Sequence, residues 1–428
     1  MTEFEIDLAE DLVPQLHNLR VFVSVADAGS VSRAAEQLFK APSAITRSII
    51  ELERALGVTL FERKPRGMLL DAYGEAVLVR ARRIQTEIQT ASENLLQASP
   101  GGQHASLSGI TGMVFSGRKL QLLLLLAELR NISSAAGHMN MTQAGASMAL
   151  SRMEAVLGQP LFLRRVDGMM ATEAANGLLV HARRVFGELR NLRSDISALS
   201  GAIAGSVVIG TSPLGRTPIF TTALAEVVTQ HPGLRVTTTE SSYEQLVRGL
   251  RSGEIDFVLA VLRPPHLCLG LQTEPLFVDR LGIMVRATHP LAGRPRVEMA
   301  DLLGERWIFP RQNSLGRPLL QQSFESLKLA PPVASVETGD LATIRQLLSV
   351  SDMLAVTSPF QLMNEIQAGT IVELPVTLPV ATRDVGLILR EGAMLSPAAR
   401  CVLEAVRNQV HGGRQAMPGA PRQTGETA

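Results

Sequence analysis

The stretch Gly29–Arg63 reads GSVSRAAEQLFKAPSAITRSIIELERALGVTLFER, and 101 residues later the stretch Arg130–Arg164 reads RNISSAAGHMNMTQAGASMALSRMEAVLGQPLFLR. Both stretches carry a pair of alanines, a Leu-Gly pair, a Leu-Phe pair and a final arginine in the same register. The match extends without a gap to Leu19–Arg83 over Leu120–Arg184. Agreement of this length at one fixed shift indicates a duplicated domain.

Each copy has the pattern of a helix-turn-helix with a β-wing. In the first copy, apolar residues recur at helical spacing over residues 19–26, and a short helix rich in small residues follows. A third helix is predicted over residues 42–57, with proline at its start and glycine at its end. The stretch 60–70 is basic around a proline and a glycine, as a β-wing would be, and a long helix is predicted over 72–97.

These residues resemble the winged reading head of LysR-type transcriptional regulators. The first copy carries the resemblance through Leu19, Phe22, Gly29, Ser30, Ala34, Ala35, Leu38, Leu52, Glu53, Leu56, Gly57, Leu60, Phe61 and Arg63. The second copy carries it through Ala135, Ala136, Thr142, Gln143, Ser147, Glu154, Leu157, Gly158, Leu161, Phe162 and Arg164. The resemblance implies DNA binding by two heads in tandem.

In a helix-turn-helix, the N-terminal residues of the recognition helix face base edges in the major groove, while wing residues meet phosphates. In the first copy the predicted DNA-binding residues are Lys40, Ser43, Thr46, Arg47, Arg54, Arg63, Lys64 and Arg66. In the second copy they are Thr142, Gln143, Ser147, Arg152, Arg164 and Arg165. The recognition helix of the second copy has a single basic residue, so we expect the first copy to supply most of the affinity.

Two further helices invite a hypothesis about partners. The first helix of the second copy is almost entirely leucine over residues 120–126, more than one buried face requires, which suggests a partner interface. A long helix follows over residues 172–199 with one apolar face. That face fits either pairing with a twin in a dimer or packing inside its own chain, and the family resemblance favours a dimerisation helix.

From residue 205 the pattern changes to alternating strands and helices, which indicates an open sheet with ligand sites at the carboxyl ends of strands. His231-Pro232, Gly253–Phe257 and His289–Leu291 resemble the LysR-type effector domain, a two-lobed fold like that of periplasmic solute-binding proteins. By their positions after strands, the residues predicted to bind an effector are Thr211, Ser212, Ser242, Arg263, Phe309, Pro310 and Thr338. The effector expected there is a carboxylate or an aromatic compound.

The fold class predicted for the chain is multidomain: two all-α winged helix-turn-helix domains with long linker helices, then an α/β effector domain. The predicted boundaries are an acidic extension 1–14, a first head 15–75, a linker helix 76–98, a flexible tether 99–115, a second head 116–172, a linker or dimerisation helix 173–200, an effector domain 205–412 and a disordered tail 413–428. Within the effector domain, lobe 1 is placed at about 205–276 plus 394–412 and lobe 2 at about 277–393.

Composition narrows the setting. The 428 residues have a formal net charge of +1, so only a local basic surface can attract DNA. The N-terminus is acidic, unlike a signal peptide, and the most apolar run (120–127) is far shorter than the ~20 residues of a membrane span. We therefore expect a cytoplasmic protein without a membrane partner. The two cysteines, Cys268 and Cys401, form no metal or disulfide pattern. The family resemblance implies a homodimer or homotetramer and RNA polymerase as a partner.

Other function classes fit less well. The sequence lacks a nucleophile elbow, a P-loop, a zinc-protease motif and a dinucleotide fingerprint, so we expect no enzyme and no cofactor. A transporter's solute-binding protein would share the last two hundred residues but would leave the duplicated heads without a purpose. An adaptor whose heads have become protein-interaction modules remains the alternative to a DNA-binding regulator.

Overall fold

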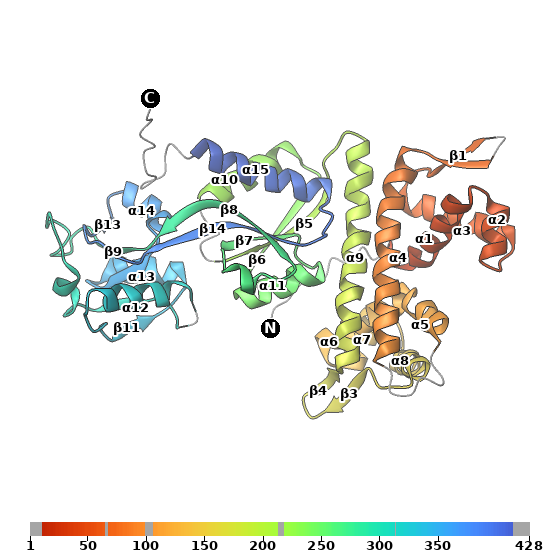
Figure 1. The fold of residues 1–428 in the computed structure, drawn as a ribbon, viewed down its shortest axis with the longest axis horizontal. Helices are drawn as coiled ribbons and strands as arrows, with labels where there is room; N and C mark the ends of the chain where they lie inside the picture. The colour runs from red at the N-terminus through yellow and green to blue at the C-terminus, as the bar shows by residue number, and fades with distance from the viewer. Residues whose placement is uncertain (1–10, 65–66, 99–105, 213–217, 313, 414–428) are drawn as a thin grey trace.

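The computed structural model describes residues 11–64, 67–98, 106–212, 218–312 and 314–413. Figure 1 shows a helical part built around two long helices, α4 (Ala72–Gln97) and α9 (Glu173–Leu199), and beside it an α/β part with two five-stranded sheets. Each copy of the repeat forms three helices and a two-stranded wing. The predicted fold class is confirmed.

In the first head, a glycine ends the first helix and an aspartate caps the start of the long helix. Its elements are η1 (Val13–Gln15), α1 (Leu16–Ala28), α2 (Val31–Gln37), α3 (Pro42–Leu56), β1 (Phe61–Lys64) and β2 (Gly67–Leu70). Gly29 ends α1 in the left-handed conformation, and Asp71 caps α4 by accepting a hydrogen bond from the N–H of Gly74 at 2.7 Å. Leu12 and Val13 are buried in this head, so the predicted extension 1–14 ends too late.

The second head repeats these contacts. Its elements are α6 (Gly117–Leu129), α7 (Ile132–His138), α8 (Gln143–Leu157), β3 (Phe162–Arg165) and β4 (Gly168–Ala171). The carboxylate of Glu154 accepts a hydrogen bond from the N–H of Leu161 at 2.8 Å, as Glu53 does from Leu60 at 2.8 Å. The shared Glu therefore ties the recognition helix to the wing in both copies.

The flexible tether predicted over 99–115 is wrong in its second half. Residues 107–114 form a helix, α5 (Leu107–Val114), and Ile110, Met113 and Val114 are buried. α5 lies against α4 and α8. The sequence predicted a tether because two glycines interrupt this short segment. The helix forms nevertheless because burial of its apolar side chains against the rest of the chain stabilises it.

The two linker helices pair with each other inside the chain, and the buried residues of both heads and both helices form one hydrophobic core. The apolar face of α9 is thus covered by its own chain. The leucines of α6 that suggested a partner interface are likewise internal, because Leu120, Leu122, Leu123, Leu124 and Leu126 are all buried. The expectation of an intermolecular interface at these leucines is wrong: α6 needs more than one apolar face because η1, α7 and α9 all contact it.

The α/β part has two lobes, each with its own sheet. The elements of lobe 1 are β5 (Gly205–Thr211), α10 (Pro218–Gln230), β6 (Leu234–Glu240), α11 (Tyr243–Ser252), β7 (Phe257–Val261), η3 (Pro265–Leu267), β8 (Leu271–Arg280), β14 (Thr382–Arg390) and α15 (Pro397–Gly413). The elements of lobe 2 are β9 (Gly282–Arg286), η4 (Met299–Leu302), β10 (Trp307–Phe309), α12 (Gly316–Ser326), β11 (Ala334–Glu337), α13 (Leu341–Val350), β12 (Leu354–Thr357), η5 (Pro359–Leu362), α14 (Met363–Gln367) and β13 (Ile371–Glu373).

The sheet orders correct the predicted lobe boundaries. Lobe 1 has the order β6-β5-β7-β14-β8 and lobe 2 the order β11-β10-β12-β9-β13. The antiparallel strands β8 and β14 pair along their length, so residues 277–280 and 382–390 belong to lobe 1 and not to lobe 2. The helix α15 runs to residue 413, and the tail predicted after it lies outside the described residues.

In the described part of the chain no single helix is long and apolar enough to span a membrane. The helices α5 and α6 together are apolar enough, but they meet at 76° and most of their apolar side chains are buried in the head core.

Candidate nucleic-acid interface and effector lobes

The recognition helix of the first head, α3, has one buried and one exposed face. Ile45, Ile49 and Leu52 are buried in the core, while Ser43 and Arg47 are exposed near the start of the helix. Proline at the first position of α3 costs no hydrogen bond there and fixes the entry of the chain. The exposed face is therefore held on a rigid support, as base contacts require.

Arg47 and Lys40 are the two cations nearest the start of α3. The Nε of Arg47 lies 2.8 Å from Glu51 on the next turn, with 79% of the Arg47 side chain exposed. Such an ion pair contributes only about 0.3–0.5 kcal/mol, so its loss on contact with DNA is cheap. The Nζ of Lys40 lies 2.6 Å from the Nε2 of His17, and burial together with Lys40 and Arg20 lowers the pKa of His17.

The remaining predicted residues of the first head fall into two groups. Thr46 is half-buried and its hydroxyl donates to the carbonyl of Pro42 at 3.1 Å, and Arg54 is exposed in the last turn of α3. Arg63 and Lys64 lie in strand β1 of the wing. Arg66 lies outside the described residues.

The recognition helix of the second head, α8, carries fewer charges. The hydroxyl of Thr142 accepts a hydrogen bond from the N–H of Gly145 at 3.1 Å, which makes Thr142 the N-cap of the helix. Gln143 donates to the hydroxyl of Ser147 at 2.9 Å. Arg152 lies beside Met148, and Arg164 and Arg165 are exposed on the wing strand β3.

Sequence reasoning missed the exposed apolar residues on the recognition helices and in the turn before α3. Ile50 on α3 and Met148 on α8 are 43% and 54% exposed, although the other large apolar side chains of both helices are buried or half-buried. Phe39, in the turn before α3, is 97% exposed and has a φ of 51°, which is strained for a bulky side chain. Superposing the two copies would have shown that Met148 takes the position of Arg47.

In lobe 1, the predicted effector residues follow neighbouring strands. Thr211 is the last residue of β5 and is buried, and Ser212 follows it with a buried hydroxyl that has no hydrogen-bond partner in the structure. Ser242 caps α11 by accepting from the N–H of Gln245. Arg263 follows β7, and its guanidinium lies 4.9 Å from the ring centre of Tyr243.

In lobe 2, the predicted residues lie at the end of β10 and beside it. The N–H of Thr338 donates to the carbonyl of Phe309 at 3.0 Å, and Pro310 follows directly. Phe309 itself is buried against Trp307 with ring centres 5.3 Å apart, so its ring packs in the core of lobe 2, and its part in a ligand site stays a prediction. The guanidinium of Arg317 covers its ring at 4.6 Å and was missed by sequence reasoning.

A buried ion pair joins the lobes where the two crossing strands meet. Arg383, at the start of β14, donates from Nε to Asp279 near the end of β8 at 2.9 Å. Ser358, from lobe 2, donates to the other oxygen of Asp279. Burial lowers the pKa of Arg383, and Asp279 opposes that shift. The sequence did not reveal this pair because the predicted boundary divided β8 between the lobes and placed all of β14 in lobe 2.

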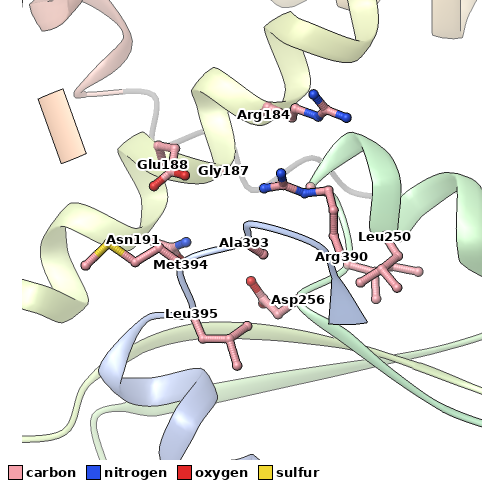
Figure 2. Close-up of a pocket in the computed structure, with 12 residues that line it drawn as sticks. Arg184, Gly187, Glu188, Asn191, Leu250, Asp256, Arg390, Ala393, Met394 and Leu395 are labelled. Carbon is pink, nitrogen blue, oxygen red and sulfur yellow. The ribbon is translucent and has the colours of Figure 1, made fainter. Parts of the chain in front are cut away.

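Lobe 1 rests on the linker helices at a polar junction. A small pocket lies between α9 and lobe 1, with Arg184, Glu188 and Asn191 on one side and Asp256 and Arg390 on the other (Figure 2). Burial lowers the pKa of Arg390, and the neighbouring Arg184 adds to the shift.

The junction is centred on Arg80 of α4, which is fully buried. Its guanidinium donates to Asp195 and Glu188 of α9, each at 2.6 Å, and to the carbonyls of Met394 and Leu395 of the effector domain at 2.7 and 3.3 Å. Burial opposes the charge of Arg80, but the two carboxylates outweigh it and raise its pKa. One side chain thus connects both linker helices with the sensing half.

Comparison with known proteins decides the family. Two segments, 16–75 and 118–176, match the model of the bacterial regulatory helix-turn-helix protein of the lysR family. Residues 200–411 match the LysR substrate binding domain. The chain is also 39% identical over 398 residues to the HTH-type transcriptional regulator GalR of Pseudomonas putida, a match that covers 93% of this chain and 98% of that protein. The chain belongs to the LysR family.

Other relatives support this assignment. The regulator GbpR of Rhizobium radiobacter is 28% identical over 58% of this LysR-family chain and 83% of its own length. Among solved structures, a full-length OxyR variant from Pseudomonas aeruginosa matches with a TM-score of 0.51 and 20% identity, over 68% of this chain and 93% of that one. That likeness concerns the fold.

The family assignment settles the function class. This LysR-type protein is a DNA-binding transcriptional regulator with helix-turn-helix heads and an effector-binding domain, and its relatives GalR and GbpR are transcriptional regulators rather than enzymes. The alternative of an adaptor with degenerate heads finds no support among them.

Proposed function

We propose that this LysR-type regulator reads DNA with both heads, and that a small carboxylate bound in the effector lobes changes this reading. DNA contact is assigned to the exposed starts of α3 and α8 and to the wings. Binding of the effector to one arrangement of the lobes favours that arrangement, and the change reaches the heads as a shift in population. The regulator would act in the cytoplasm, as a homodimer or homotetramer, with RNA polymerase as a further partner.

The exposed cations of the first head support its part in DNA binding. Among the described residues the guanidinium of Arg47 pairs only with Glu51, and it can bind a guanine bidentately, a contact worth about 1–3 kcal/mol of discrimination. The second head offers Gln143, whose amide suits adenine, but no exposed cation at the start of α8, all of which the structure describes. We therefore propose that the first head supplies most of the affinity.

Buried polar atoms without partners support a carboxylate effector. Among the described residues, three such atoms follow the carboxyl ends of strands: the hydroxyls of Ser212 and Ser314 and the Nε of Arg263. Buried donors without partners are rare in native proteins and point to a missing ligand or water. Hydroxyl groups and an arginine guanidinium are donors that suit a carboxylate, which arginine binds bidentately.

Selection of genomic DNA fragments by the purified full-length protein tests the DNA-binding part. We expect one enriched motif, whose binding weakens with rising salt because phosphate contacts release counterions. Arg47→Ala should weaken binding to that motif more than Gln143→Ala does. Enrichment of no motif, with and without carboxylates, would contradict the proposal.

Ligand-induced shifts in melting temperature test the effector part, with a panel of aromatic and aliphatic carboxylates on the full chain. At least one acid should raise the melting temperature, and Arg263→Gln should weaken its binding about tenfold, as loss of a charge-assisted hydrogen bond implies. Arg235→Gln is the matched control, because Arg235 lies exposed on β6 of the same lobe. Equal affinity in both variants would remove Arg263 from the site.

A further inference from the structure

The contacts between α4 and α9 repeat themselves under the sequence shift of the duplication. Arg80, Arg83 and Glu87 of α4 stand at the positions of His181, Arg184 and Glu188 of α9. The contacts form two matching pairs: Arg80 to Glu188 at 2.6 Å with His181 to Glu87 at 2.7 Å, and Arg83 to Glu188 at 2.7 Å with Arg184 to Glu87 at 3.4 Å. Each ion pair therefore has a counterpart in which both residues are replaced by their equivalents in the other copy.

Such reciprocity is the mark of a two-fold axis. In an isologous interface, residue i of one unit contacts residue j of the other, and j contacts i. Here both units belong to one chain, the helices run antiparallel, and the heads lie at opposite ends of the helix pair (Figure 1). The heads also share one core, in which Gly117 of the second head packs against Val13 of the first.

A two-fold axis keeps any direction along itself unchanged. The part of the exposed α3 face that points along this axis is therefore matched by α8 on the same side of the helix pair, and the two heads meet a duplex on that side with reversed polarity. The heads lie at opposite ends of the α4–α9 pair, and α4, with 26 residues at 1.5 Å each, is about 39 Å long. This length is close to the ~34–36 Å between successive major grooves on one face of the duplex. The internal pair thus has the geometry that other helix-turn-helix proteins build from two chains.

We propose that one chain is the complete DNA-reading dimer and that its operator consists of two unlike half-sites in inverted orientation. This rests on the proposed function, in that the heads must bind DNA. Two chains reading a palindrome would need equal heads, whereas the two heads here differ on the exposed face.

The differences lie where bases are read. Arg47 of α3 is replaced by Met148 in α8, and Ile50 is replaced by Ser151. Lys40, before α3, corresponds to Met141. Arginine selects guanine, while an apolar side chain suits the methyl group of thymine. The half-site under the first head is expected to contain guanine, and the half-site under the second to be rich in A and T.

Two measurements on the full chain test the inference. Selection from a random duplex library should yield a motif with two different halves in inverted orientation. Native mass spectrometry on a duplex that carries several copies of the motif should find as many bound chains as motifs, whether the chains bind singly, as a homodimer or as a homotetramer. A palindrome of equal halves, or two chains on each motif, would overturn the inference while leaving DNA binding intact. Selection of no motif would overturn the proposed function, and this inference with it.

Exchange of side chains between the heads sharpens the test. The variant Arg47→Met with Ile50→Ser gives α3 the side chains of α8 at two exposed positions, and the selected motif should change in one half only, toward the other half. The reciprocal variant Met148→Arg should change the opposite half. Arg235→Gln, in lobe 1, is the control and should leave both halves unchanged. A change in both halves with either exchange would refute the assignment of one head to each half-site.

Discussion

Replacement of Arg80 by methionine tests whether the buried junction holds the heads and the sensing half together. Arg80 has no exposed surface and hydrogen-bonds two carboxylates and two carbonyls. In the variant, Glu188 keeps Arg83 at 2.7 Å, but Asp195 loses the only side-chain partner that the described residues give it. Removal of one partner from a buried ion pair leaves an uncompensated charge and costs about 3–5 kcal/mol.

The assay is urea unfolding of the full chain, followed by helical circular dichroism. Urea is preferred because it is uncharged and does not screen the ion pair. The slope rises with the surface exposed on unfolding and exceeds the about 1–3 kcal/mol per molar urea of small proteins, so the expected loss moves the midpoint down by roughly 1 M. Arg82→Met is the matched control on the same helix: the Arg82 side chain is 59% exposed and its pair with Asp27 contributes at most about 1 kcal/mol.

A double variant separates the charge from the packing. Arg80→Met with Asp195→Leu removes the stranded carboxylate and should recover part of the loss, since apolar replacements for buried ion pairs are often well tolerated. If Arg80→Met shifts the midpoint no more than Arg82→Met does, the reasoning about the junction is refuted. If the double variant unfolds at a lower urea concentration than Arg80→Met, the stranded carboxylate is not the cause. The lost stability is then assigned to the missing hydrogen bonds to Met394 and Leu395.

Three further predictions concern the heads. Gly117→Ala places a Cβ about 2.1 Å from the carbonyl oxygen of Val13 and should lower the melting temperature by several degrees, whereas Gly112→Ala, with open space around it, should not; equal melting points would show that the heads do not pack as described. Phe39→Asn, which installs the residue found at the equivalent position of the second head, should stabilise the chain by about 0.5–1 kcal/mol in urea unfolding by relieving the left-handed strain, and a loss of stability would contradict it. Arg47→Ala should weaken operator binding about 10-fold or more, measured by fluorescence anisotropy, with carboxylate binding unchanged; unchanged operator affinity would count against its role.

The sequence predicts the heads well because their signals are local. Helical spacing, the terminal glycines Gly57 and Gly158, and the wing all depend on neighbours within a few residues. Pairing is a long-range property. An apolar stripe on α9 shows that it must be covered, but α4 lies about a hundred residues away and nothing in the stripe names it as the partner.

The same limit explains the errors in the sensing half. The chain crosses between the lobes along β8 and β14, and sequence alone gives no sign of where a crossing strand ceases to belong to one sheet. Phe309 shows the same limit. It ends a strand, where ligands are often bound, but Trp307, two residues earlier, lies on the same face of the strand, and the two rings pack together in the core. A position after a strand predicts at which edge of the sheet a ligand site lies, but it does not predict in which direction a given side chain points.

The two copies have kept and changed different kinds of position. Many of the shared residues are internal: the alanine pairs, Leu60 with Leu161 and Phe61 with Phe162 are buried, and Glu53 and Glu154 tie helix to wing with the same hydrogen bond. The exposed starts of the recognition helices differ instead. Equal interiors preserve the two-fold pairing of the heads, while unequal surfaces give each head its own reading of DNA. A homodimer cannot separate these two requirements, since any change in its recognition helix appears twice; a duplication within one chain can.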